Sequence, residues 1–109
     1  AFAQYDLPNV DVIGYDVLSN RPKTTAYRAP GSPISAYGVE SCVDELAREL
    51  GMEPLRLREI NAAKEGTKAA HGPTWTNIGY QKTLEAARDS DHYKTKLGPN
   101  QGRGIASGF

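Results

Sequence analysis

An arginine and a proline–glycine turn stand directly before a helix start, in the run AYRAPGSP at residues 26–33. Arg28 carries five N–H donors in a planar fork that matches a carboxylate or a phosphate. Gly31 lets the backbone approach a ligand closely or take a positive φ. A helix N-terminus presents N–H groups without intrahelical partners and a partial positive charge, and both favour anions. The spacing therefore predicts an anionic ligand held between Arg28 and the first helical turn.

Simpler interpretations exist for the same residues. An arginine beside a turn is more often a partner in a surface ion pair than an anion clamp. The neighbouring Gly31 and the helix start favour the clamp. Ser32 and Ser35 carry hydroxyls that could donate to a ligand, but we expect capping of the helix to be their role.

The other reactive side chains favour structural roles. Cys42 lies on an apolar helical stripe, which predicts a packed core thiol rather than a nucleophile. His71 and His92 have no second histidine or carboxylate at metal-ligand spacing, so we expect solvated side chains and no metal site. Trp75 is expected to anchor its polar loop to a neighbouring surface. Three carboxylates lie close together in the sequence, those of Glu40, Asp44 and Glu45. We expect them on the solvated face of a helix, or against another domain of a larger protein.

The longest helical pattern directly follows the proline–glycine turn and runs to Leu50. Ser32 is the expected N-cap, Pro33 the first helical residue and Gly51 the residue that ends the helix. Apolar residues recur with a period of 3.6 residues and predict the face that packs against the strands. They are Ile34, Val39, Cys42, Val43, Leu46, Ala47 and Leu50.

Two shorter helices and several short strands complete the expected fold. One helix begins at Pro54 and ends near Asn61, and another covers residues 80–90, with an extension through residue 97 as an alternative. Residues 62–76 contain glycine and proline without a clear period and predict a loop. Alternating β-branched and aromatic residues predict strands, at residues 10–18, 24–28 and 104–109. One long helix, two shorter helices and short strands make an α+β fold.

Composition narrows the function class. The 109 residues suit one small domain at most, and 13 basic residues balance 13 acidic ones. Because the charges balance, the chain has no overall electrostatic attraction to nucleic acid or to a membrane surface. No apolar run has transmembrane length. A single cysteine excludes an internal disulfide and fits a reducing, cytoplasmic compartment, with the periplasm as the alternative.

The sequence indicates that this chain is a piece of a larger protein. It begins with Ala1 rather than Met and stops inside the run RGIASGF, and its 11 glycines and 7 prolines leave little material for an independent core. We therefore expect residues 1–109 to be a single fragment whose exposed apolar surface favours self-association.

Several motifs together resemble one known family. They are AYRAPGSP, E-x-x-x-D-E-L-A at residues 40–47, LGMEPLRLRE at residues 50–59, and Asn61. With YDLPNV at residues 5–10 and SNRP at residues 19–22, the chain resembles the molybdenum-binding large subunit of the xanthine dehydrogenase, aldehyde oxidase and carbon monoxide dehydrogenase family. The resemblance covers the whole chain but only a small central slice of that subunit.

The resemblance implies a fragment of a molybdopterin-binding domain. Members bind molybdopterin, in bacteria usually as the cytosine dinucleotide, and hydroxylate an aldehyde or a heterocycle with oxygen from water. Electrons leave through 2Fe–2S clusters and FAD on partner subunits or domains. By resemblance, Arg28 contacts the molybdenum site, Ala29 and Gly31 belong to the same cofactor-binding loop, and Pro30 lines the substrate pocket.

The chain departs from the family pattern inside this loop. Many members carry glycine at the position of Ala29 and a bulky residue at that of Pro30. Pro30 should stiffen the turn, hold Ala29 extended and remove an aromatic wall, which favours a small aldehyde over xanthine. The family's catalytic glutamate and glycine-rich pterin motif have no match here, so the resemblance implies an isolated chain that is inactive and without cofactor.

Two other function classes remain open. A non-enzymatic module could dock its helices onto a partner, and a small phosphate-binding domain could use the same helix start.

Overall fold

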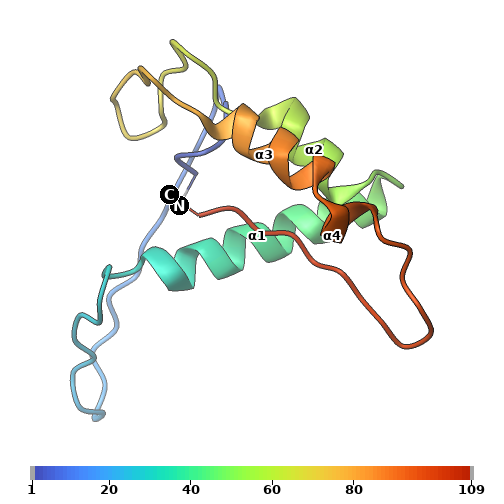
Figure 1. Ribbon diagram of the computed structural model, residues 1–109. Coiled ribbons are helices and arrows are strands. Elements are labelled where there is room, and N and C mark those ends of the chain that lie inside the picture. The colour runs from blue at the N-terminus through green and yellow to red at the C-terminus, as the bar shows by residue number, and fades with distance from the viewer. Residues whose placement is uncertain (1, 109) are drawn as a thin grey trace.

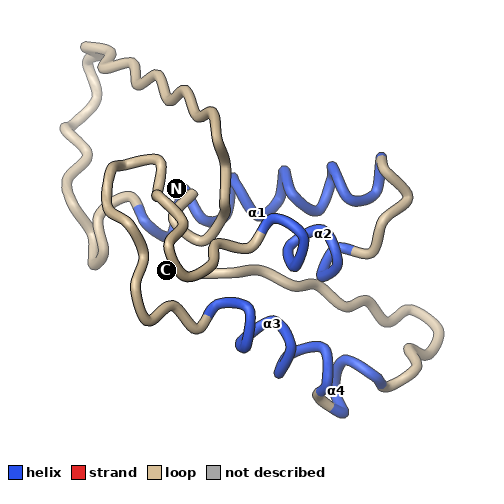
Figure 2. The backbone as a smooth tube through the Cα atoms, turned by 90° about the horizontal axis from the view of Figure 1, so that it is seen from above, coloured by secondary structure: helices blue, strands red, loops and turns tan. Residues whose placement is uncertain are grey.

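The computed structural model describes residues 2–108, which form four helices joined by long loops (Figure 1). The first and longest is α1 (Ser32–Glu49), and α2 (Pro54–Asn61) returns beside it. They are followed by α3 (Tyr80–Asp89) and the short α4 (Asp91–Lys94). Figure 2 shows α2 between α1 and α3, so the middle helix carries the contacts that join the others.

The predicted strands are not formed in residues 2–108, so the described chain is mostly helical and its predicted α+β layout is not confirmed. Two isolated bridges, Tyr5 with Ala62 and Lys68 with Thr74, are the β pairing of the described residues. Residues 10–18 and 24–28 are exposed, and no strand among residues 2–108 lies beside them to take their backbone hydrogen bonds. Residues 104–108 are likewise extended without pairing, and Phe109 lies outside the described residues.

A tight turn sets the start of α1. The N–H of Ser32 donates to the carbonyl of Ala29 at 2.9 Å, and Gly31 takes φ 78° and ψ −20°. Proline at the second position and a positive-φ glycine at the third define a type II turn. Gly31, not Ser32, is therefore the N-cap, and its cap has no side-chain hydrogen bond. Ala29 takes φ 55° rather than the predicted extended conformation, and its carbonyl accepts the hydrogen bond from Ser32 that closes the turn.

The end of α1 is a Schellman motif. The N–H of Gly51 donates to the carbonyl of Arg48, and the N–H of Met52 donates to that of Ala47 at 2.8 Å. Gly51 has φ 61°, which a residue without Cβ adopts at little cost. The prediction that Gly51 ends the helix is confirmed.

The shorter helices begin and end close to the predicted residues. The Glu53 side chain accepts from the N–H of Arg56 and caps α2, and Pro54 occupies its first turn. The predicted continuation of α3 breaks at Ser90, whose backbone is extended. The Ser90 hydroxyl accepts from the N–H of Tyr93 and starts α4 as a separate turn.

The small apolar core lies between α2 and α3. Leu55, Ala62 and Leu84 are buried together, and three half-buried residues pack around them, namely Tyr80, Tyr93 and Ile105. The rings of Tyr5 and Tyr80 meet edge to face with centroids 6.2 Å apart. Leu84 is the buried residue of α3 and places that helix against the core.

The predicted apolar face of α1 is largely uncovered. Of its stripe, Ala47 is fully buried, whereas Ile34, Leu46 and Leu50 are at least half exposed and Cys42 is an exposed free thiol. Cys42 therefore is not a packed core residue. Helix α2 packs instead on the side of α1 that carries Glu40, which leaves an open apolar groove of about 350 Å³. The groove is lined by Phe2, Tyr5, Leu7, Gly38, Val39, Cys42, Val43, Leu46, Leu57 and Asn61.

Within residues 2–108, the longest helix falls short of the apolar character that crossing a bilayer requires.

Candidate functional site

The turn before α1 forms one wall of a cavity of about 450 Å³. Pro30 and Gly31 lie in that wall, and Ser32 and Ser35 continue it along the first helical turn. Ala3 and Gln4, near the beginning of the chain, also line this cavity. The fold therefore brings two of the four predicted site residues to one cavity at a helix N-terminus.

The other two predicted site residues stay outside this wall. Arg28 and Ala29 are exposed and do not line the cavity. Arg28 makes no ion pair with any described residue, so its guanidinium is not committed to the surface pair that the simpler interpretation expects. It stands three residues before Gly31, and none of its donors is bonded to a described residue.

The electrostatics at the start of α1 favour an anion. No acidic side chain lies in the first turn, and no side chain caps it. The Ser35 hydroxyl donates to the carbonyl of Ser32 at 3.2 Å rather than capping the helix. The positive end of the macrodipole consequently meets the cavity without an internal counter-charge in that turn.

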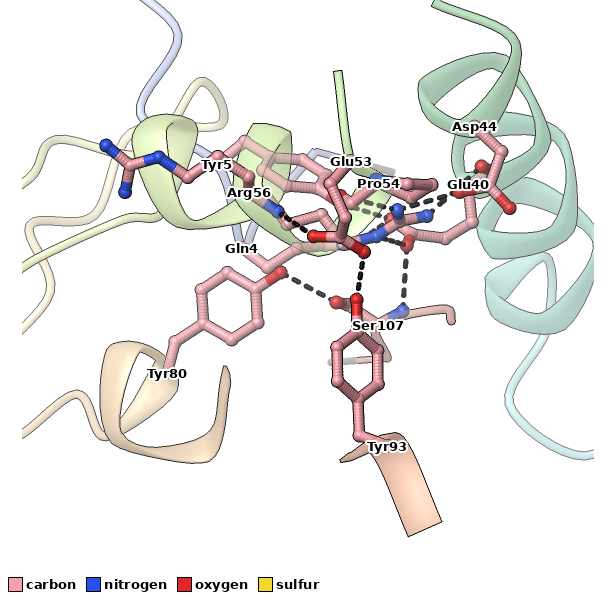
Figure 3. Close-up of polar contacts among 11 residues, drawn as sticks. Gln4, Tyr5, Glu40, Asp44, Glu53, Pro54, Arg56, Tyr80, Tyr93 and Ser107 are labelled. Carbon is pink, nitrogen blue, oxygen red and sulfur yellow. Dashed lines mark hydrogen bonds and ion pairs between the residues drawn. The ribbon is translucent and has the colours of Figure 1, made fainter. Parts of the chain in front are cut away.

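A polar cluster with buried Glu40 at its centre adjoins this cavity through Gln4, and Figure 3 shows its side chains. Glu40 of α1 accepts from Arg58 Nε at 2.8 Å, from the Tyr5 hydroxyl at 2.6 Å and from Gln4 Nε2 at 3.2 Å. It also accepts from the backbone N–H of Ser107 at 2.8 Å. One carboxylate thus joins both ends of the described chain to α1 and α2.

Arg58 balances that carboxylate from α2. Its side chain is fully buried, and its remaining donors reach Asp44 at 2.7 Å and the carbonyls of Pro54 and Glu40. Burial works to lower the pKa of Arg58, but its hydrogen bonds with Asp44 and Glu40 outweigh it and the pKa is raised. The guanidinium therefore stays charged inside the protein.

Two tyrosines beside the cluster stay protonated. Burial raises the pKa of Tyr5, and the hydrogen bond to the Glu40 carboxylate raises it further. Burial likewise raises the pKa of Tyr80, whose hydroxyl lies 2.6 Å from that of Ser107. Both phenols act as hydrogen-bonding groups and not as acids at neutral pH.

The sequence prediction missed this cluster. Glu40 is 4% exposed, so its predicted place on the solvated face is wrong, and its buried partner Arg58 was not among the predicted site residues. The reason is that α2 packs on the polar side of α1, where paired charges replace apolar contacts. Glu40 and Asp44 are four residues apart and share one helix face, which is the signal that could have suggested a common cationic partner.

The remaining candidates have local roles. Trp75 Nε1 donates to the carbonyl of Ala3 at 3.0 Å, which confirms that it anchors its loop. His71 is exposed and its ring lies 5.7 Å from that of Trp75. The described residues contain no group of three metal-binding side chains.

The cavity residues fit an anionic, hydrogen-bonding cofactor. The wall combines an uncapped helix start, two serine residues and the buried amide of Gln4, and it carries no carboxylate. Backbone and hydroxyl donors of this kind suit phosphate or other oxyanion groups.

The chain is similar to large oxidoreductases over most of its length. It is 38% identical over 86 residues to the nicotinate dehydrogenase large molybdopterin subunit of Eubacterium barkeri, which covers 78% of the chain and 20% of that protein. It is 41% identical over 64 residues to an aldehyde oxidoreductase of Megalodesulfovibrio gigas, covering 59% of the chain and 7% of the relative. It is 28% identical over 93 residues to xanthine dehydrogenase of Dictyostelium discoideum, and this match covers 85% of the chain and 7% of the relative.

The chain spans about a fifth or less of the length of these relatives. The family profile of the molybdopterin cofactor-binding domain matches residues 1–62, which include the turn, the whole of α1 and α2, and Glu40 and Arg58. The chain therefore belongs to the molybdopterin cofactor-binding domain family.

Proposed function

We propose that this chain supplies part of the molybdopterin site of a molybdenum hydroxylase. Arg28, Ala29 and Gly31 contact the cofactor, and Pro30 lines the substrate pocket. The observation that carries this proposal is the type II turn, which places Pro30 and Gly31 in the wall of a cavity at an uncapped helix start. The family match over residues 1–62 supports the same ligand.

The chain's own residues position and stabilise charge. Arg28 offers a fork of donors to an oxyanion, and the start of α1 adds a partial positive charge beside it. The bound cofactor supplies the redox chemistry by which an aldehyde or heterocyclic carbon gains an oxygen from water. We assign no acid or base to this chain, so its contribution is electrostatic positioning of the cofactor and shaping of the pocket.

Pro30 favours a small substrate. Its ring is compact and has no aromatic face for a flat heterocycle to stack on. We propose a small aldehyde ahead of xanthine, with a heterocycle as the second class because one relative is a nicotinate dehydrogenase subunit.

The complete assembly has further parts in this proposal. The rest of the molybdenum subunit surrounds the cavity, and partner subunits carry 2Fe–2S clusters and FAD. The cofactor is the cytosine dinucleotide form of molybdopterin, and the enzyme is bacterial and works in the cytoplasm. In that subunit, residues 10–18 and 24–28 pair with further strands, which restores the α+β layout.

The test compares two arginines in the full-length protein. Arg28→Ala should lower turnover about 100-fold, the size of effect typical for loss of one charge-stabilising donor. Arg21→Ala is the matched control, because Arg21 is also an exposed arginine of the same loop and should leave turnover unchanged. Molybdenum and released pterin are measured in each sample. Full turnover of Arg28→Ala at full cofactor loading would contradict the assignment.

A further inference from the structure

The segment before α1 is a projecting apolar arm. Figures 1 and 2 both show the chain ahead of α1 as a loop that runs out beyond the helices. Within this loop, residues 10–18, here called the arm, carry five large apolar side chains that are at least 66% exposed. They are Val12, Ile13, Tyr15, Val17 and Leu18. Single exposed apolar side chains are normal on a protein surface, but a run of them marks a contact surface.

The open groove on α1 is an apolar hollow in the same chain. It holds about 350 Å³, and Val39, Val43 and Leu46 of α1 form part of its wall. Leu7 lines the groove just before the arm begins, but the described residues of the arm itself do not line it. One chain therefore carries an uncovered apolar projection and an uncovered apolar hollow, and the two do not meet within one copy.

The molecule exposes more surface than a compact protein of its size. Its accessible surface is 8790 Å², whereas a folded monomer of this mass exposes about 5,900 Å². Its radius of gyration is 16.6 Å, against about 13 Å for a compact chain of this length. The excess of about 2,900 Å² is larger than the roughly 800 Å² per partner that a standard interface buries. The uncovered surface is therefore sufficient for a stable dimer.

We propose that two copies of this chain exchange arms, so that residues 10–18 of each copy lie in the α1 groove of the other. Such a dimer is closed by a two-fold axis, because each copy gives one arm and receives one. Arm-in-groove contact covers both apolar surfaces, whereas contact between two grooves would leave the arms in water. The inference concerns the 109-residue chain by itself, since the proposed function assigns the arm to further strands of the complete subunit.

Analytical ultracentrifugation of the 109-residue chain measures the affinity of the dimer. Ile13→Asp removes one buried isoleucine from each arm, and each contributes about tenfold, so the dimer dissociation constant should rise about 100-fold. Ile34→Asp is the matched control, because Ile34 is an exposed isoleucine outside the arm and the groove; it should leave the dissociation constant as in wild type. Helical circular dichroism should be unchanged in both variants, since both side chains are exposed in a single copy.

Cysteine cross-linking tests the arrangement of the two copies. Cys42 is the single cysteine of the chain, and it is exposed and lines the groove. A chain with Ile13→Cys and Cys42→Ser is mixed with a tagged wild-type chain of different length and mildly oxidised. Arm-in-groove contact should give disulfides between the two kinds of chain. Lys96→Cys with Cys42→Ser places the thiol at an exposed position outside both surfaces and should give only background cross-linking.

Three results would overturn the inference. If the wild-type chain stays monomeric throughout the concentration range, another occupant covers the groove, such as the further length of subunit that the relatives possess. Disulfides mainly between two Ile13→Cys chains would assign the interface to contact between arms. Disulfides mainly between two wild-type chains would assign it to contact between grooves.

Discussion

Arg58 Nε donates to Glu40 Oε2 at 2.8 Å, and both side chains are almost completely removed from solvent. This contact joins α2 to α1 at the point where the segments around Tyr5 and Ser107 also meet the carboxylate. Four parts of the chain that are far apart in sequence thus share one buried anion. The apolar core is small, so this buried cluster is expected to contribute strongly to holding them together.

Removal of the Glu40 charge should destabilise the chain strongly. Glu40→Gln leaves the buried Arg58 guanidinium with Asp44 as its remaining anion, and we expect a loss of about 3 kcal/mol in the free energy of unfolding. Urea denaturation followed by circular dichroism measures this loss. Glu45→Gln, an exposed carboxylate on the same helix, is the control and should change stability by less than about 0.5 kcal/mol. Equal effects of the two substitutions would refute the central role of Glu40.

Stability should fall in alkaline solution. The pKa of Tyr5 in the folded chain is raised above the unfolded value of about 10, so its stabilising contribution is present below pH 10 and is lost as the pH rises above it. Tyr5→Phe should make this alkaline loss shallower, with Tyr80 and Tyr93 supplying the rest because their pKa values are raised too. The free energy of unfolding between pH 8 and pH 11 measures the slope. Tyr27→Phe, at an exposed tyrosine, should leave the slope as in wild type.

Gly38 inside α1 and Gly51 just after its end should respond to alanine with opposite signs. Gly51→Ala forces a Cβ into a backbone with φ 61°, and we expect a loss of about 1 kcal/mol. Gly38→Ala adds a methyl group in open space within the helix and should stabilise the chain by about 0.5–1 kcal/mol. Thermal unfolding of both variants gives the comparison. A shift in the same direction for both would argue against the Schellman geometry.

The open groove on α1 should drive self-association of the 109-residue chain. Leu46 lines that groove and is 51% exposed, so Leu46→Glu places a charge in an apolar contact and should shift sedimentation toward monomer. Ile34→Glu changes an isoleucine of the same helix that is 80% exposed and lies outside the groove, and it should sediment like wild type. A wild-type chain that sediments as a monomer at high concentration would rule out association through this face.

Local features of the fold could be predicted from sequence, because short-range chemistry determines them. Pro30 with Gly31 predicts a turn, Pro54 a helix start and Gly51 a helix end, and each depends on backbone angles within a few residues. The N-cap of α1 was predicted at Ser32 and lies one residue earlier, at Gly31. The difference arises because the last residue of the type II turn's centre is itself the cap. The strands predicted at residues 10–18 and 24–28 are not formed, for another reason. A strand needs a second strand to pair with, and local propensity cannot provide one.

The sequence by itself determined the turn, the three main helices and the family, since each depends on neighbouring residues or on motifs read in order. Only the tertiary structure decided which face of α1 is covered, and with it the burial of Glu40, Arg58 and Gln4. Hydrophobic periodicity identifies an apolar stripe but not the element that packs against it. Here Arg58 of α2 pairs with Glu40 and Asp44 on the polar side of α1. Because α2 packs on that side, part of the apolar stripe is left lining an open groove.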